Sequence, residues 1–257
     1  MLPPPESIAF APIQELRVVT ENGDGVILFD AARIPQADRD VLDESRWPAL
    51  GKRGRGSVKR VQGDFGAGVL RAYRRGGLVA RINRERYLWT GEAQTRPFRE
   101  FRLLAMMRAR GLPVPAPLAA GFWRSGPFYR ASILTAEIDD ATTLAECLTE
   151  VMAIPEIWRD LGATLGRFHA VGICHADLNA HNLLRDQTRQ WWLIDFDRGV
   201  LRKPDASWPQ GRLLRLNRSL RKLGCAQLSG WPQAWEQLLD AHEQALQRGL
   251  AIGKKSA

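Results

Sequence analysis

Three side chains that end in carboxylate or amide oxygens, Asp177, Asn182 and Asp195, occur in the stretch GICHADLNAHNLLRDQTRQWWLIDFDRG, residues 172–199. No helix or strand period requires this spacing, and apolar residues lie beside them, where an unpaired charge is expensive to bury. Two carboxylates that came close together would repel each other. A divalent cation removes that repulsion, and hard oxygen ligands suit Mg²⁺, whose coordination shell is usually completed by nucleotide phosphates. The stretch therefore predicts magnesium-dependent phosphate chemistry.

The order of these residues, H-x-D-x-x-x-x-N followed by D-F thirteen residues after the Asn, is typical of protein-kinase-like phosphotransferases. A lone His-x-Asp usually marks a turn or a cap, and a lone IDF usually ends a strand. Their combination after a helix that ends in FHAVG favours the kinase-like interpretation. We expect Asp177 to be the catalytic residue that orients the acceptor hydroxyl and takes its proton late, and Asn182 and Asp195 to be the metal ligands. His175 should brace the loop rather than titrate.

The upstream half of the chain contains candidates for binding the nucleotide, ATP. Gly54 and Gly56 in GRGS precede a strand-like segment, where glycine backbone can approach phosphates closely. Arg71 in GVLRAY stands where kinases carry a lysine on a strand, and Glu100 in FREF stands where the partner carboxylate of that lysine lies on the next helix. Arginine stays charged and can grip phosphate oxygens through two nitrogens, but it is bulkier than lysine. The alternative is that Arg71 is an exposed strand cation and Glu100 a solvated helix residue.

Hydrophobic periodicity predicts the elements that must position these residues. Strand-like segments with a hairpin at Ser125–Gly126 come first, helical segments dominate later, and the character of the sequence changes near residue 138. We expect an α+β, two-lobed protein-kinase-like fold with ATP in the cleft between the lobes. The N-terminal lobe, mainly antiparallel sheet plus a helix, would span 1–137 with a lead-in over 1–45, and the mainly helical catalytic and substrate lobe would span 138–257. The expected helices lie in the segments 96–111, 154–172, 212–224 and 231–249.

Bulk properties limit the class of protein and its partners. The chain has 257 residues, a formal net charge of +9 and an ordinary globular composition, so long disorder is not expected. Its three cysteines have no metal-ligand spacing and their odd number argues against a disulfide framework, which fits a reducing compartment. The N-terminus lacks the pattern of a signal peptide, and no apolar run is long enough to span a membrane. The charge favours a polyanionic partner: nucleic acid, anionic lipid or a phosphorylated substrate.

Three segments, YRRGGLVARINRERYLW, FREFRLLAMMRARGLPVPAPLAAG and CHADLNAHNLL with WLIDFDRG, resemble the bacterial 3-deoxy-D-manno-octulosonic acid (Kdo) kinases, which are relatives of the lipopolysaccharide core heptose kinases. The similarity covers roughly residues 45–225. It implies phosphorylation, by ATP with Mg²⁺, of a Kdo sugar on the lipid A precursor, at its 4-hydroxyl. It also implies a peripheral protein on the cytoplasmic face of the inner membrane. Asp177, Asn182 and Asp195 match the catalytic aspartate and the metal ligands, and the upstream residues match less securely.

Departures from protein kinases favour a small-molecule or glycolipid acceptor. Asp197 replaces the glycine of D-F-G, Asn179 replaces a phosphate-contacting lysine, and no A-P-E motif follows. The basic segment RLLRLNRSLRKLG has a leucine stripe with cations on its other faces, and RAYRRGGLVARINRER adds five arginines besides Arg71. Such segments could lie on an anionic membrane surface or grip the anionic Kdo–lipid A precursor. The alternative is an ordinary core stripe with a solvated positive face. The stripe and the cations are Leu213, Leu216, Leu220, Leu223, Arg212, Arg215, Arg218, Lys222, Arg74, Arg75, Arg81, Arg84 and Arg86.

Three other functions fit parts of the sequence. A lipopolysaccharide heptose kinase or an aminoglycoside-type phosphotransferase shares the loop pattern, although the latter should recruit polycations through acidic surfaces, which conflicts with a charge of +9. A pseudokinase could use the basic surface to bind lipid or nucleic acid, but the complete set of metal-ligand residues argues against loss of catalysis. No RNA- or DNA-binding motif is recognisable, and no obligate protein partner is indicated.

Overall fold

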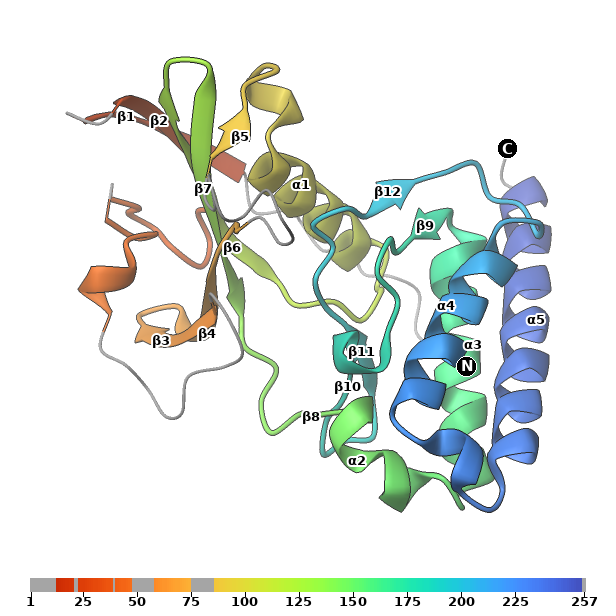
Figure 1. Ribbon diagram of the computed structural model, residues 1–257. Coiled ribbons are helices and arrows are strands. Elements are labelled where there is room, and N and C mark those ends of the chain that lie inside the picture. The colour runs from red at the N-terminus through yellow and green to blue at the C-terminus, as the bar shows by residue number, and fades with distance from the viewer. Residues whose placement is uncertain (1–12, 21–22, 39, 48–57, 75–85, 256–257) are drawn as a thin grey trace. The chain divides into compact units, whose positions relative to one another are not determined.

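The computed structural model describes residues 13–20, 23–38, 40–47, 58–74 and 86–255. By its contacts the chain divides into two compact units, one formed by 1–110 and 115–137 and the other by 111–114 and 138–257. The architecture is mixed, with an antiparallel sheet in the first unit and most of the helices in the second (Figure 1).

The described strands of the first unit form one seven-stranded sheet in the order β1-β2-β6-β7-β4-β3, with β5 paired to β7, and every pairing in it is antiparallel. The predicted hairpin is present and joins β6 to β7. The strands are β1 Ile13–Thr20, β2 Gly23–Asp30, β3 Val58–Gly63, β4 Gly66–Ala72, β5 Tyr87–Leu88, β6 Pro117–Ser125 and β7 Phe128–Ala136.

The lead-in is part of this sheet. Its hairpin β1–β2 extends the sheet from the edge of β6, and the segment after β2, which includes the short helix η1 (Glu44–Arg46), packs on the sheet. Ile27, Phe29 and Leu42 from this region are buried in one cluster with Leu118 and Leu134 from the later strands. The lead-in, which was expected within the N-terminal lobe, thus contributes apolar residues that complete the core of the first unit.

Helix α1 (Arg96–Ala109) follows the short helix η3 (Glu92–Gln94) and packs on β6 and β7 (Figure 1). Pro97 lies in its first turn, where the missing N–H costs no helical hydrogen bond. Gly111, with φ +68°, lies just past its end and adopts the left-handed conformation that commonly closes a helix. Phe98, Phe101 and Leu104 lie on its buried face, as their helical spacing predicts.

The second unit is built on helices α3 and α5, which pack side by side (Figure 1). The spacing predicts α3 and α4 well, whereas α5 continues beyond the expected end. Small strands β8, β10 and β11 form one sheet, and β9 pairs with β12. The elements are β8 Thr142–Thr143, α2 Leu144–Val151, α3 Pro155–Ala170, β9 Ile173–Cys174, η4 Ala180–Asn182, β10 Leu183–Arg185, β11 Trp191–Leu193, β12 Val200–Leu201, α4 Pro209–Lys222, η5 Cys225–Gln227 and α5 Trp231–Lys255.

Close contact between α3 and α5 depends on glycine. A Cβ atom at Gly162 would lie 2.1 Å from the carbonyl oxygen of Leu238, and one at Gly166 would lie 2.5 Å from that of His242. The same interface buries His169, whose Nδ1 lies 2.7 Å from Nε2 of His242. These helices form the support on which the loop after β9 is built. No described helix combines the length and the hydropathy needed to cross a membrane.

Candidate active site

The loop that carries Asp177 leaves β9 and enters the short helix η4. Leu178 and Ala180 are fully buried, while Asp177, which directly precedes them, is exposed, so the apolar side chains anchor the loop and leave the carboxylate on its outer side. Strand β9 is in turn paired with β12, which follows Asp195 in the sequence. The loop and the D-F segment are therefore held by one framework.

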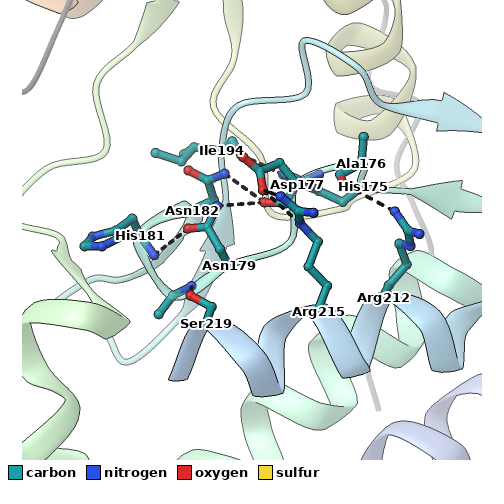
Figure 2. A network of polar contacts seen from close by, with 11 residues as sticks. His175, Ala176, Asp177, Asn179, His181, Asn182, Ile194, Arg212, Arg215 and Ser219 are labelled. Carbon is teal, nitrogen blue, oxygen red and sulfur yellow. Dashed lines mark hydrogen bonds and ion pairs between the residues drawn. The ribbon is translucent and has the colours of Figure 1, made fainter. Parts of the chain in front are cut away.

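His175 joins the two segments, as predicted. Its Nδ1 accepts the backbone N–H of Asp177 at 3.1 Å, so the ring proton is on Nε2, which donates to the carbonyl oxygen of Ile194 at 2.9 Å. Burial lowers the pKa of His175, although the hydrogen bond to Ile194 and the charges of Asp195 and Asp177 partly oppose this. The imidazole is thus a neutral brace (Figure 2).

Asn182 is a second connection between the loop and the D-F segment. Its side-chain Nδ2 donates to the backbone oxygen of Asp177 at 3.0 Å, and its own backbone oxygen accepts the N–H of Ile194 at 3.1 Å (Figure 2). With Nδ2 used inside the loop, the amide oxygen Oδ1 is the end that can face a ligand.

Asp195 has a left-handed backbone conformation, with φ +64°. Non-glycine residues rarely adopt it, and it is found where surrounding structure enforces it, often at functional sites. The next residue, Phe196, is buried, stacks on Phe168 at 6.2 Å between ring centroids and contacts the ring of His175 at 4.6 Å, so packing fixes the chain directly after Asp195. The apolar run WWLID, residues 191–195, predicts a strand that reaches Asp195, but β11 (Trp191–Leu193) is shorter and leaves Asp195 outside it.

The residue types fit a magnesium ion. An amide oxygen from Asn182 and a carboxylate from Asp195 are hard ligands of the kind that Mg²⁺ binds together with phosphate oxygens. Within the described residues no group of three or more His, Cys, Asp or Glu side chains is arranged to hold a metal ion. A magnesium ion that arrives with a nucleotide usually has only one or two carboxylate ligands from the protein.

Asp177 forms an ion pair with Arg215 on α4. Arg215 Nε donates to Asp177 Oδ1 at 2.9 Å and Nη2 donates to the same oxygen (Figure 2). Partial burial would raise the pKa of Asp177, but the hydrogen bond and positive charge of Arg215 outweigh it and hold the pKa below the usual value. The carboxylate is therefore ionised at neutral pH and can accept a proton or a hydrogen bond.

The second Asp of the D-F-D sequence lies in a turn. The N–H of Gly199 donates to the carbonyl oxygen of Phe196 at 2.8 Å, which closes a turn over Asp197 and the residue after it. Where protein kinases have a glycine, this chain therefore has a residue inside a hydrogen-bonded turn.

In the first unit, Arg71 and Glu100 form the expected pair. Arg71 Nη2 donates to Glu100 Oε1 at 2.7 Å and to Oε2 at 2.6 Å, and the side chain of Glu100 is 3% exposed. The alternative of a solvated Glu100 is therefore wrong. Gly54 and Gly56, the candidates for phosphate contacts, lie outside the described residues, as do Arg75, Arg81 and Arg84.

The alternation of side chains along a strand predicts that Tyr73 shares a face with Arg71, and the structure shows that Tyr73 is a member of this cluster. Its hydroxyl donates to Glu100 Oε2, and the guanidinium of Arg71 lies 4.7 Å from the centre of its ring. Arg71 and Tyr73 point the same way because side chains alternate along a strand. The spacing R-x-Y, which starts at the position where kinases carry the lysine, was thus a sequence signal for a role of Tyr73 beside Arg71.

The leucine stripe of α4 is core for most of its length, since Leu213, Leu216 and Leu220 are buried. Leu223 was wrongly included: it lies past the last turn and is 40% exposed. The spacing of α4 predicts that Arg215 is a surface cation, whereas in the structure Arg215 pairs with Asp177, the candidate catalytic residue. The helical periodicity of the sequence places Arg215 on this helix, but only the folded chain identifies Asp177 as its partner.

A braced H-x-D-x-x-x-x-N loop bonded to a D-F segment, with a cation–carboxylate pair on a sheet strand and the next helix, is the arrangement of a kinase-type phosphotransferase. The model of the Lipopolysaccharide kinase (Kdo/WaaP) family matches residues 41–242, and the chain belongs to this family. The protein is therefore a kinase.

Curated relatives with similar sequences carry one name, 3-deoxy-D-manno-octulosonic acid kinase. One from Xanthomonas campestris pv. campestris (strain B100) is 45% identical over 233 residues, 89% of this chain and 93% of that protein. One from Stenotrophomonas maltophilia (strain R551-3) is 44% identical over 234 residues, 89% and 93% of the two chains. One from Xylella fastidiosa (strain 9a5c) is 44% identical over 231 residues, 88% and 92%.

Proposed function

We propose that the protein transfers a phosphoryl group from ATP to a Kdo sugar, at its 4-hydroxyl, on the Kdo–lipid A precursor of lipopolysaccharide. The names of the relatives at 44–45% identity support the acceptor. One observation carries the reaction: Asp177 is an exposed, ionised carboxylate in a loop whose other polar groups are fixed by hydrogen bonds.

The proposal assigns the two parts of the chain different tasks within a two-lobed, protein-kinase-like fold. Residues 1–137 would bind the nucleotide through Arg71, which Glu100 holds, and through Gly54 and Gly56. Residues 138–257 would hold the magnesium ion through Asn182 and Asp195 and would supply the catalytic residue.

Bound Mg²⁺–ATP would supply the phosphoryl group and neutralise its charge. Asp177 accepts a hydrogen bond from the acceptor hydroxyl, orients it and takes its proton late in the transfer. Asn182 keeps the loop closed by its bond to the backbone of Asp177, and His175 fixes the loop against Ile194. Positioning supplies most of the acceleration that protein groups can give to this reaction.

The exposed side of α4 supports an anionic acceptor and a peripheral location on the cytoplasmic face of the inner membrane. Arg218, Arg221 and Lys222 are exposed there, and so is Leu214 at 53%. A helix with cations and an apolar side chain on its outer face can lie on anionic lipid, each cation contributing about 1 kcal/mol near the surface. Co-sedimentation with vesicles should therefore need anionic lipid and weaken with added salt, whereas equal binding to neutral vesicles would contradict this part.

The test of the reaction is mass spectrometry of Kdo–lipid A precursor after incubation with ATP, Mg²⁺ and the purified protein. The expected product carries one added phosphate, and NMR of that product should locate it at the 4-hydroxyl. The Asp177→Asn protein, purified identically, is the control for contaminating kinases. Heptosylated core and aminoglycosides are assayed in parallel, and phosphorylation of either one in place of the Kdo precursor would overturn the proposed acceptor.

A further inference from the structure

One face of α4 binds the catalytic loop. Three of its polar residues are spaced by three and four positions, so they share a side of the helix. Each contacts a backbone or side-chain atom of the loop (Figure 2). The contacts are Arg212 Nη1 to the oxygen of Ala176 at 3.3 Å, Arg215 Nε to Asp177 Oδ1 at 2.9 Å, and the N–H of Ala180 to Ser219 Oγ at 3.2 Å.

The loop itself brings no cation to Asp177. Asn179, two residues later, stands where protein kinases carry a lysine, and its side chain is used within the loop. Asn179 Nδ2 donates to the backbone oxygen of Asp177 at 2.9 Å, while its Oδ1 accepts the N–H of His181 at 2.9 Å. In the part of the chain that the structure describes, Arg215 is the residue that forms an ion pair with Asp177.

We propose that Arg215 is the positioning residue for Asp177 and replaces, from α4, the missing cation of the loop. The inference rests on the proposed role of Asp177. Both donor nitrogens of Arg215 bind the same oxygen, Oδ1. The carboxylate is thereby held through one oxygen and presents the other to the acceptor hydroxyl.

The support for Arg215 is more rigid than a loop residue would be. Helix α4 is fixed by Leu213, Leu216 and Leu220, which are buried, so the guanidinium projects from an anchored element. Its pair with Asp177 is exposed, at 44% and 52% of the two side chains, and an ion pair this exposed contributes little to stability. A role in function accounts for its geometry better than a role in folding.

The test compares Arg215→Ala with Arg46→Ala. The Arg46–Asp38 pair has nearly the same exposure, 43% and 53%, and lies in a different part of the sequence, so its loss measures the effect of breaking an exposed pair. We expect Arg215→Ala to lower kcat about 100-fold, as a small misplacement of a reacting group can do. The KM values for ATP and acceptor, ATP affinity by calorimetry and the thermal unfolding temperature should stay close to those of Arg46→Ala. Arg215→Lys should recover part of kcat, because it restores the charge with one donor nitrogen.

The outcomes separate this inference from the proposed function. Loss of activity in Asp177→Asn with wild-type kcat in Arg215→Ala would overturn the role of Arg215 alone. A rise in the acceptor KM with unchanged kcat would also overturn it, because Arg215 would then bind the acceptor rather than position Asp177. Near-normal turnover in Asp177→Asn would refute the proposed mechanism itself.

Discussion

Two arginine–carboxylate pairs, one in each unit, differ in almost every physical respect. Glu100 is buried, receives Arg71 on both oxygens and also binds the hydroxyl of Tyr73. Asp177 is half exposed and is bound by Arg215 through one oxygen. A buried carboxylate cannot leave its partners without a large cost, whereas an exposed one can exchange contacts with a ligand at little cost.

In the proposed function, this difference separates two tasks that a kinase needs. The Arg71–Glu100–Tyr73 cluster is a permanent part of the first unit, and it can hold a cation in one place for a nucleotide. The Asp177–Arg215 pair of the second unit can accept a new hydrogen bond without unfolding anything. Breaking the first should therefore reduce stability, and breaking the second should reduce activity.

The largest effect should come from Asp177→Asn. The amide cannot take the proton of the acceptor hydroxyl, so we expect kcat to fall about 1,000-fold with ATP affinity and thermal unfolding nearly unchanged. Steady-state assays with Kdo–lipid A precursor measure kcat, and calorimetry with Mg²⁺–ATP measures the ATP affinity. Asp38→Asn is the control, because Asp38 is similarly exposed and also pairs with an arginine. If Asp177→Asn lost stability but kept its kcat, the Asp177–Arg215 pair would be structural like the Arg71–Glu100 pair, which would contradict the comparison.

The His169–His242 pair is buried but belongs to the second unit. It therefore tests whether burial, and not membership of the first unit, makes a polar contact contribute to stability. Burial lowers the pKa of His169, next to His242, to about 3 and that of His242 to about 4. Unfolded histidines titrate near pH 6.5, so between pH 6.5 and 4 the unfolded state binds more protons and stability falls with falling pH. From pH 7 to 5 each histidine should remove about 2 kcal/mol of unfolding free energy.

Urea denaturation at several pH values measures this dependence. The double variant His169→Gln/His242→Gln carries no titratable group at the two positions, so its stability should depend less on pH in this range. An unchanged slope in the variant would show that other groups cause the dependence.

Glu100→Ala should destabilise the protein by about 3 kcal/mol, because it leaves Arg71 without its charge partner in a mostly buried position. Chemical denaturation measures the change. Glu15→Ala removes the carboxylate of the exposed pair with Arg17 and should cost less than about 1 kcal/mol. Equal costs for the two variants would mean that burial does not distinguish the pairs.

Tyr73→Phe should have the smallest effect, a loss of about 1.5 kcal/mol. It removes the hydroxyl that donates to Glu100 but keeps the ring over which the guanidinium of Arg71 lies. The same denaturation experiment measures it. No loss of stability would indicate that the hydroxyl is not needed to hold Glu100.

Much of the fold followed from the sequence. The apolar spacing of α3 predicted its buried face, and the turn residues predicted the hairpin β6–β7. The lead-in was not predicted as part of the sheet, because alternating apolar residues identify a strand but not its neighbour in the sheet. The end of β11 was also misplaced, since Asp195 has a left-handed backbone and packing fixes the next residue, Phe196.

The sequence alone determined which residue types could do the chemistry, because H-x-D-x-x-x-x-N and D-F specify loop positions through local spacing. It also determined the Arg71–Glu100 candidates, because kinases carry a cation on a strand and its partner carboxylate on the next helix. Only the tertiary structure decided that Tyr73 completes that pair and that Arg215 holds Asp177. The partners in the second case are separated by 38 residues, and periodicity shows which face of a helix a side chain occupies but not what lies opposite.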